Sequence, residues 1–125
     1  MFIITEDKSI YLTRGDIATI EVSANEHDGT PYAFRVGDIV RLKVFKRKQH
    51  DVVVLEKDVT VTEESITVDI HLERIDTRIG EVINKPVDYW YEVELNPDTA
   101  PQTIVGYDSD GPKIFRLFPE GGTIE

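Results

Sequence analysis

Residues 10–16 read Ile10-Tyr11-Leu12-Thr13-Arg14-Gly15-Asp16, and an alternating run follows from Ile17 to Ala24. Alternation of apolar and polar side chains is typical of a strand that buries one face. A glycine between two such runs can supply the positive φ of a tight turn. This stretch therefore predicts two strands joined at Gly15, and the rest of the chain repeats the same order of strand, turn and strand.

Further alternating runs recur every 8–12 residues or so, which is typical of an all-β sandwich. The expected strands span residues 9–13, 16–24, 38–46, 52–62, 66–72, 87–96, 102–107 and 113–118. Residues 73–79 are the one plausible helical segment, and we expect them to cross from one sheet to the other. We therefore predict an immunoglobulin-like Greek-key β-sandwich of about eight strands with one short helical connector.

The chain of 125 residues suits a single β-sandwich domain over residues 1–125. Residues 1–8 are expected to form a first short strand or an arm that docks on another subunit, and residues 119–125 a tail. In the strand expected at 52–62, Lys57 falls among the apolar residues of one face. We therefore expect a bulge or bend close to Lys57 and Asp58.

The strands expected at 38–46 and 87–96 have complementary faces. In an immunoglobulin-like Greek key, the third strand pairs with the strand that follows the sheet-crossing connector. One antiparallel register satisfies both faces, because cross-strand neighbours of opposite charge or aromatic type stabilise a sheet. Its outer pairs are Arg41 with Glu94, Lys43 with Glu92 and Phe45 with Trp90, and its inner pairs are Val40 with Leu95, Leu42 with Val93 and Val44 with Tyr91.

In that register, Phe45 and Trp90 lie side by side on a charged outer face. Exposed aromatic neighbours suggest a contact surface, and the alternative is that a loop such as 32–36 or the N-terminal arm covers them. We expect contacts with other proteins to involve Phe2, Ile3, Phe45, Trp90 and Phe115.

Composition excludes several classes of protein. There are no cysteines, so disulfides and thiolate metal sites are excluded. The formal net charge of -10 disfavours binding to nucleic acid. The N-terminus lacks the basic and apolar regions of a signal peptide, and no apolar run approaches the ~18 residues of a membrane span. We therefore expect synthesis in the cytoplasm and no contact with membranes.

Two loop motifs invite a functional interpretation. Arg14-Gly15-Asp16 is an adhesion tripeptide, but here it joins two strands and its charges are expected to face solvent. Asp108-Ser109-Asp110-Gly111 begins like a calcium-binding loop, but the closing glutamate of such a loop is missing. A turn explains both motifs.

Strand residues offer two further candidates. Asp69 and His71 share the outer face of one strand, but a metal site would need more ligands. Tyr89, Trp90 and Tyr91 could form a sugar-binding platform, although both tyrosines fall on the core face, where a tyrosine corner is the alternative. The sequence shows no catalytic constellation, and we expect no enzyme, cofactor or metal.

The order of several segments resembles a known family. The segments are Tyr11-Leu12-Thr13-Arg14-Gly15-Asp16, Asp28-Gly29, Val40-Arg41-Leu42-Lys43-Val44-Phe45-Lys46-Arg47, Ile66-Thr67-Val68-Asp69-Ile70-His71-Leu72, Asp76-Thr77, Tyr91-Glu92-Val93-Glu94-Leu95 and Gln102-Thr103-Ile104-Val105-Gly106. In this order they resemble the N-terminal domain of phage baseplate upper proteins, over roughly residues 9–118. The approach to the late tyrosine strand, residues 80–87, is longer here than in that family.

The resemblance implies a non-enzymatic structural module of a phage or prophage tail or baseplate. Such a module would bind other tail proteins, would form a dimer or trimer, and would belong to the virion when assembled. The alternative from the residues is a carbohydrate-binding or adhesion module of the same fold, which requires an exposed coplanar aromatic pair.

Overall fold

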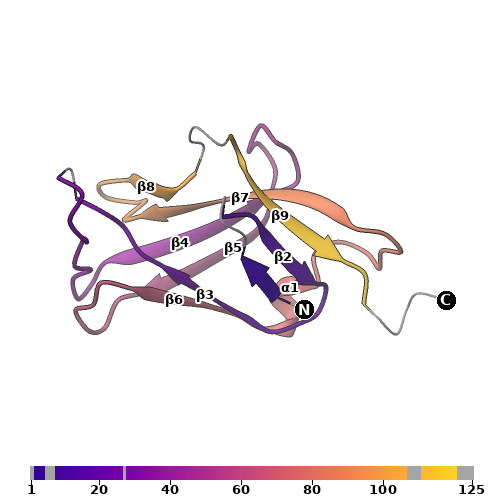
Figure 1. Cartoon of the computed structure of the whole chain (residues 1–125), viewed down its shortest axis with the longest axis horizontal. Coiled ribbons are helices and arrows are strands. Elements are labelled where there is room, and N and C mark those ends of the chain that lie inside the picture. Colours follow the sequence, from indigo (N-terminus) through magenta and orange to yellow (C-terminus); the bar gives the residue numbers. More distant parts are fainter. Residues whose placement is uncertain (1, 5–7, 27, 107–110, 121–125) are drawn as a thin grey trace.

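The structure, a computed structural model, describes residues 2–4, 8–26, 28–106 and 111–120. This part of the chain is an all-β sandwich, as predicted from the sequence, with nine strands and one short helix (Figure 1). In chain order, the elements are β1 Phe2–Ile4, β2 Ile10–Thr13, β3 Ala18–Val22, β4 Ile39–Phe45, β5 Val53–Thr60, β6 Val68–Leu72, α1 Arg74–Thr77, β7 Val87–Leu95, β8 Gln102–Val105 and β9 Lys113–Phe118.

The strands form two sheets of unequal size. The larger sheet has the order β1-β2-β9-β7-β4-β5, and β8 also pairs with β7, beyond the stretch that β9 occupies. β2 runs parallel to β9, whereas the other neighbours in this sheet are antiparallel. The smaller sheet is the antiparallel pair β3 and β6. The immunoglobulin-like Greek-key connectivity stays a prediction.

The register predicted between the third strand and the late tyrosine strand is confirmed. All six expected pairs between β4 and β7 are present, from Val40 opposite Leu95 to Phe45 opposite Trp90. The turn after β7 fixes one end of this pairing, since the N–H of Asn96 donates to the carbonyl of Ile39 (2.7 Å) and its side chain accepts from the Ile39 N–H (2.9 Å).

The core lies between the two sheets, and alternate side chains of the strands point into it. Leu12, Leu42, Ile70, Val93 and Phe115, one from each of five strands, have 0% exposure. Phe34, in the loop expected to cover the outer face, instead lies in this core with 0% exposure, held by backbone bonds to Ser65. The loop therefore fills the sandwich rather than covering Phe45 and Trp90.

α1 is shorter than the helix expected at 73–79, and it connects the smaller sheet to the larger one as predicted. The Glu73 N–H donates to the Asp76 carboxylate (2.8 Å), which also receives the ammonium of Lys57 (3.0 Å). This ion pair, rather than a bulge at Lys57 and Asp58, accommodates Lys57 among apolar residues. The register shift in β5 lies instead opposite Val44 and Phe45. Within the described residues, no helix has the length and apolar character needed to cross a membrane.

The segment expected as a first strand or an arm is a strand: β1 pairs with β2, with Phe2 opposite Leu12. In the expected tail, residues 119 and 120 are described, and Glu120 forms an ion pair with Arg14 (2.9 Å).

Replacing Leu42 with alanine should lower the free energy of unfolding by about 2–5 kcal/mol, because the side chain is fully buried and leaves a cavity. Urea denaturation monitored by circular dichroism measures this. The control is Val36→Ala, in a loop where valine is 70% exposed, and its effect should stay within about 0.5 kcal/mol. Equal effects of the two substitutions would contradict the assigned core.

Candidate functional site

The aromatic pair expected on the outer face is present in register but is not an exposed surface. Phe45 lies opposite Trp90, yet it is only 3% exposed. The ring of His50 stacks on the Phe45 ring with centroids 4.3 Å apart and planes 4° from parallel. His50 therefore occupies the outer side of the Phe45 ring in this structure, and contact between Phe45 and another protein stays a prediction.

The turn between β4 and β5 places His50 over the sheet. The backbone pairs Lys46 with Val52 (2.8 Å) and His50 with Arg47 (2.9 Å), and His50 adopts the left-handed conformation with φ 59°. Its Nδ1 lies 3.4 Å from a Glu92 carboxylate oxygen. The cover over Phe45 thus comes from the adjacent hairpin and not from residues 32–36 or the N-terminal segment, as considered from the sequence.

The other expected contact residues differ in their accessibility. Phe115 has 0% exposure and belongs to the core, and its contact with a partner stays a prediction. Phe2 is half-buried and packs against the core. Trp90 is also half-buried, and its cross-strand partners are Phe45 on β4 and Ile114 on β9. Ile3 pairs through its backbone with Tyr11, and its side chain lies outside the described part.

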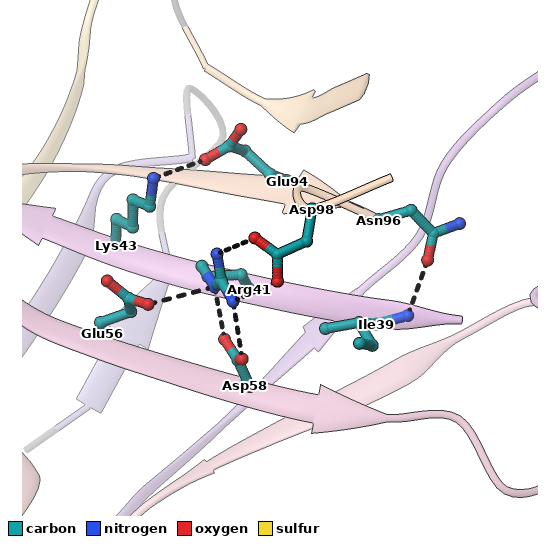
Figure 2. A network of polar contacts seen from close by, with 8 residues as sticks. All are labelled: Ile39, Arg41, Lys43, Glu56, Asp58, Glu94, Asn96 and Asp98. Atoms are coloured by element: carbon teal, nitrogen blue, oxygen red, sulfur yellow. Dashed lines mark hydrogen bonds and ion pairs between the residues drawn. The ribbon is translucent and has the colours of Figure 1, made fainter. Parts of the chain in front are cut away.

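Beside the aromatic pair, the outer face carries a network of charges (Figure 2). Arg41 makes two bonds to Asp58 (2.7 and 3.0 Å) and also contacts Glu56 (3.2 Å) and Asp98 (3.1 Å). These hydrogen bonds, first of all those to Asp58, raise the pKa of Arg41 and keep it charged. The outer face is therefore held together internally by one guanidinium shared among three carboxylates.

The second basic residue of this face pairs diagonally. Lys43 lies opposite Glu92 in the register, as predicted, but its Nζ approaches Glu94 Oε1 at 3.1 Å. The two atoms are close enough for an ion pair, although they are not aligned for a hydrogen bond. Glu92 is left to face His50. The face carries more carboxylates than cations, which opposes binding of anionic partners.

The described residues contain no candidate site for calcium or another metal ion, because no three or more of their histidine, aspartate or glutamate side chains form a suitable group. His71 instead contacts the hydroxyl of Thr19 (3.0 Å) and the carboxylate of Glu73 (3.0 Å). Asp108, Ser109 and Asp110 of the calcium-like motif lie outside the described residues.

Tyr89 and Tyr91 are buried on the core face, as expected. Tyr91 donates its hydroxyl proton to the carbonyl of Lys8. The hydroxyl of Tyr89 lies 3.2 Å from where a Cβ on Gly80 would stand, so it approaches the connector closely. Neither ring is available as a sugar platform.

Arg14 has a structural role that the sequence analysis did not predict. It forms the turn of the adhesion-like tripeptide, but its side chain is buried at 8% exposure rather than facing solvent. It donates to the carbonyls of Ile79 (3.3 Å) and Gly80 (2.8 Å) and pairs with Glu120. Its place in the alternating series of Ile10 and Leu12 was a signal for this inward direction. Arg14 therefore ties the β2–β3 turn to the connector and to the end of β9.

Three exposed aliphatic side chains lie on segments that Arg14 and neighbouring hydrogen bonds join to one another. The hydroxyl of Thr77 in α1 donates to the carbonyl of Asp16 (2.8 Å), so the turn, the helix and the connector adjoin. Ile17, Ile75 and Val82, one on each of these segments, are 53%, 83% and 67% exposed. We call these three residues the α1-end patch.

Comparisons with family models, with curated proteins and with solved structures find no match to this chain. The class that the fold defines is thus an all-β sandwich, and function rests on the surfaces described above.

Replacing Arg14 with alanine should lower the free energy of unfolding by about 2–3 kcal/mol, because buried carbonyl acceptors lose a charged donor. Glu120→Gln is the matched variant: it keeps an oxygen for Arg14 and the two carbonyl bonds, so its effect should stay below about 1 kcal/mol. Urea denaturation of both variants measures the difference. If Arg14→Ala left the free energy of unfolding unchanged, the role assigned to Arg14 would be contradicted.

Stability should fall as the pH drops below about 5, and the loss should continue below about 4. Hydrogen bonds from Arg41 lower the pKa of Asp58; burial opposes ionisation of Asp76, but the Glu73 N–H and Lys57 lower its pKa overall. Because folding lowers the pKa of these carboxylates, their ionised forms stabilise the folded state at pH values above their pKa in the unfolded chain. As the pH falls, the unfolded chain binds protons more readily than the folded chain does, and this stabilisation is lost.

The midpoint of urea unfolding as a function of pH measures this loss. Asp58→Asn removes one of the carboxylates, so its midpoint should decline less steeply than that of the unsubstituted protein. A midpoint that stays constant across the range would show that these carboxylates do not act as described.

Proposed function

We propose that this protein is a non-enzymatic structural module of a phage or prophage tail or baseplate, which acts through protein–protein contacts and self-association into a dimer or trimer. The proposal is supported by the order of segments that resembles the N-terminal domain of baseplate upper proteins. The all-β sandwich is compatible with a passive role, because its function would depend on presenting fixed surfaces rather than on moving parts.

The observation that carries the proposed contact role is the α1-end patch. Single exposed aliphatic side chains are ordinary on protein surfaces. Here Ile17, Ile75 and Val82 stand on three segments that hydrogen bonds hold together, and each is more than half exposed. Burial of such a side chain at an interface contributes about 1.5–3 kcal/mol. The patch therefore replaces Phe45 and Phe115 as our candidate contact surface.

The carbohydrate-binding alternative has less support. It requires an exposed coplanar aromatic pair, and Phe45 lies beneath His50. Tyr89 and Tyr91 are in the core.

The double substitution Ile75→Asp and Val82→Asp should keep the protein monomeric at concentrations where the unsubstituted chain forms dimers or trimers. Two carboxylates in an apolar contact would have to be desolvated without partners. Light scattering at several concentrations measures the association. The control is Val36→Asp, which changes a side chain of similar exposure (70%) at the other end of the sandwich and should leave association unchanged.

A protein that remains monomeric at every concentration would contradict self-association. The tail assignment has a separate test in the gene neighbourhood: flanking genes for tail proteins, holin and lysin are expected, and a neighbourhood without any tail gene would count against it.

A further inference from the structure

A cleft runs along β3 on the side away from β6. Its wide part, of 580 Å³, lies between the end of β3 with the loop that follows and the strands β7 and β8. Its lining includes Ala24, Glu26, Leu95 and Thr103. A smaller cavity of 70 Å³ lies beside β3 itself; it is lined by Glu21, Val22, Val93 and Val105, and also by Lys8 and by Ile4 of β1. We call the two together the β3–β8 cleft. In Figure 1, the chain after β3 runs to the same end of the sandwich as β8.

The two long sides of the sandwich differ. On one side, β5 of the larger sheet lies next to β6 of the smaller sheet, and the layers meet. On the other side, within the described residues, β3 pairs only with β6 and β8 pairs only with β7. Each of these two strands thus presents one edge to the cleft without a partner strand from the described part.

The edge of β3 lacks several of the features that protect an exposed strand edge. Such edges commonly carry lysine, proline or a bulge. β5, the edge strand on the closed side, has Lys57 and a register shift. β3 reads Ala18-Thr19-Ile20-Glu21-Val22, with neither lysine nor proline, and its pairing with β6 is regular throughout.

We propose that the β3–β8 cleft binds an extended segment of another protein, in which apolar residues alternate with basic ones and which adds as a strand to the free edge of β3. In this mode, main-chain hydrogen bonds supply affinity and alternate side chains supply specificity. The site is independent of the tail assignment, and it lies at the opposite end of β3 from the α1-end patch.

The residues that line the cleft explain why alternate residues of the bound segment should be apolar. Side chains of an added strand that point inward would enter the space beside Val22, Val93, Leu95 and Val105, all of which are buried or nearly so. A volume of 580 Å³ falls within the range of about 300–1,000 Å³ that is typical of ligand sites.

The carboxylates beside the cleft explain why the other residues of the bound segment should be basic. Outward side chains of an added strand would stand next to Glu21, which is itself opposite Asp69 on β6, and at the wide end next to Glu26. Lys8 lines the smaller cavity and is the one cation among the lining residues of the described cleft. Opposite charges on neighbouring strands are stabilising and like charges destabilising.

A second copy of this chain fits the cleft less well. Pairing of two β3 edges would place the Glu21 carboxylates of both copies on neighbouring strands, where like charges are destabilising. Such pairing would also extend the smaller sheet without supplying a segment that fills the wide part of the cleft.

The test uses the intact protein and a fluorescently labelled peptide of alternating valine and lysine, about seven residues long, to match the edge of β3 at roughly 3.4 Å per residue. Fluorescence anisotropy should show saturable binding. The same peptide with glutamate in place of lysine, and a version with proline at the central position, should each bind at least about tenfold more weakly.

Charge reversal in the protein locates the site. The double substitution Glu21→Lys and Glu26→Lys should weaken binding of the lysine peptide about tenfold or more and improve binding of the glutamate peptide. The control, Glu63→Lys and Glu64→Lys, makes the same change in net charge at two exposed residues of the β5–β6 turn. It should leave binding within about twofold.

The outcomes decide between occupants. Binding with this charge dependence, together with slower hydrogen exchange of the β3 amides, supports strand addition at the cleft. Equal losses in both double variants would show non-specific attraction, and equal binding of the proline peptide would exclude strand addition; either result overturns the proposal. Concentration-dependent protection of β3 without peptide would identify a second copy as the occupant and would overturn it too.

Discussion

The antiparallel pairing of β4 with β7 is the constraint on which the rest of the structure depends. A shift by one residue would turn every side chain of a strand to the other face. It would place Arg41 and Lys43 in the core and expose Leu42 and Val44. Because β5 joins β4 on one side and β8 and β9 join β7 on the other, the larger sheet is built outward from this pair. The bonds between Asn96 and Ile39 fix its end.

This pairing was also the part of the fold that the sequence predicted best. Both faces constrain the register, since one face must be apolar and the other must match charges, and the alternation with period two specifies which residues those are. The strand boundaries follow from the same pattern to within about two residues, which is the usual uncertainty at the end of an element. The partner of β3 and the parallel contact of β2 with β9 depend on the path of the chain, which periodicity does not encode.

The side chains that sequence reasoning misplaced share a physical cause: each is satisfied by a residue distant from it or by an unusual backbone conformation. Phe45 is covered because His50 adopts a positive φ, which is uncommon outside glycine and has no local signal here. Lys57 is satisfied by Asp76 in the connector. Arg14 continues the inward series of Ile10 and Leu12, but a charged residue is rarely buried without partners, and its partners lie on the connector and after β9.

β3 links the two surfaces that we associate with function, because Ala18 adjoins the α1 end and Val22 adjoins the cleft. Within the described residues, β3 pairs with one strand, β4 pairs with two and β7 pairs with three, so β3 has fewer strand partners than either. Segments with few partners open locally at lower free energy than central strands. A strand added at the cleft would therefore order β3 along its length. That order would reach the turn at Asp16, whose carbonyl holds Thr77 of α1. Because the bond between Thr77 and Asp16 joins the turn before Ile17 to the helix that carries Ile75, binding at the cleft would also make two residues of the α1-end patch more rigid.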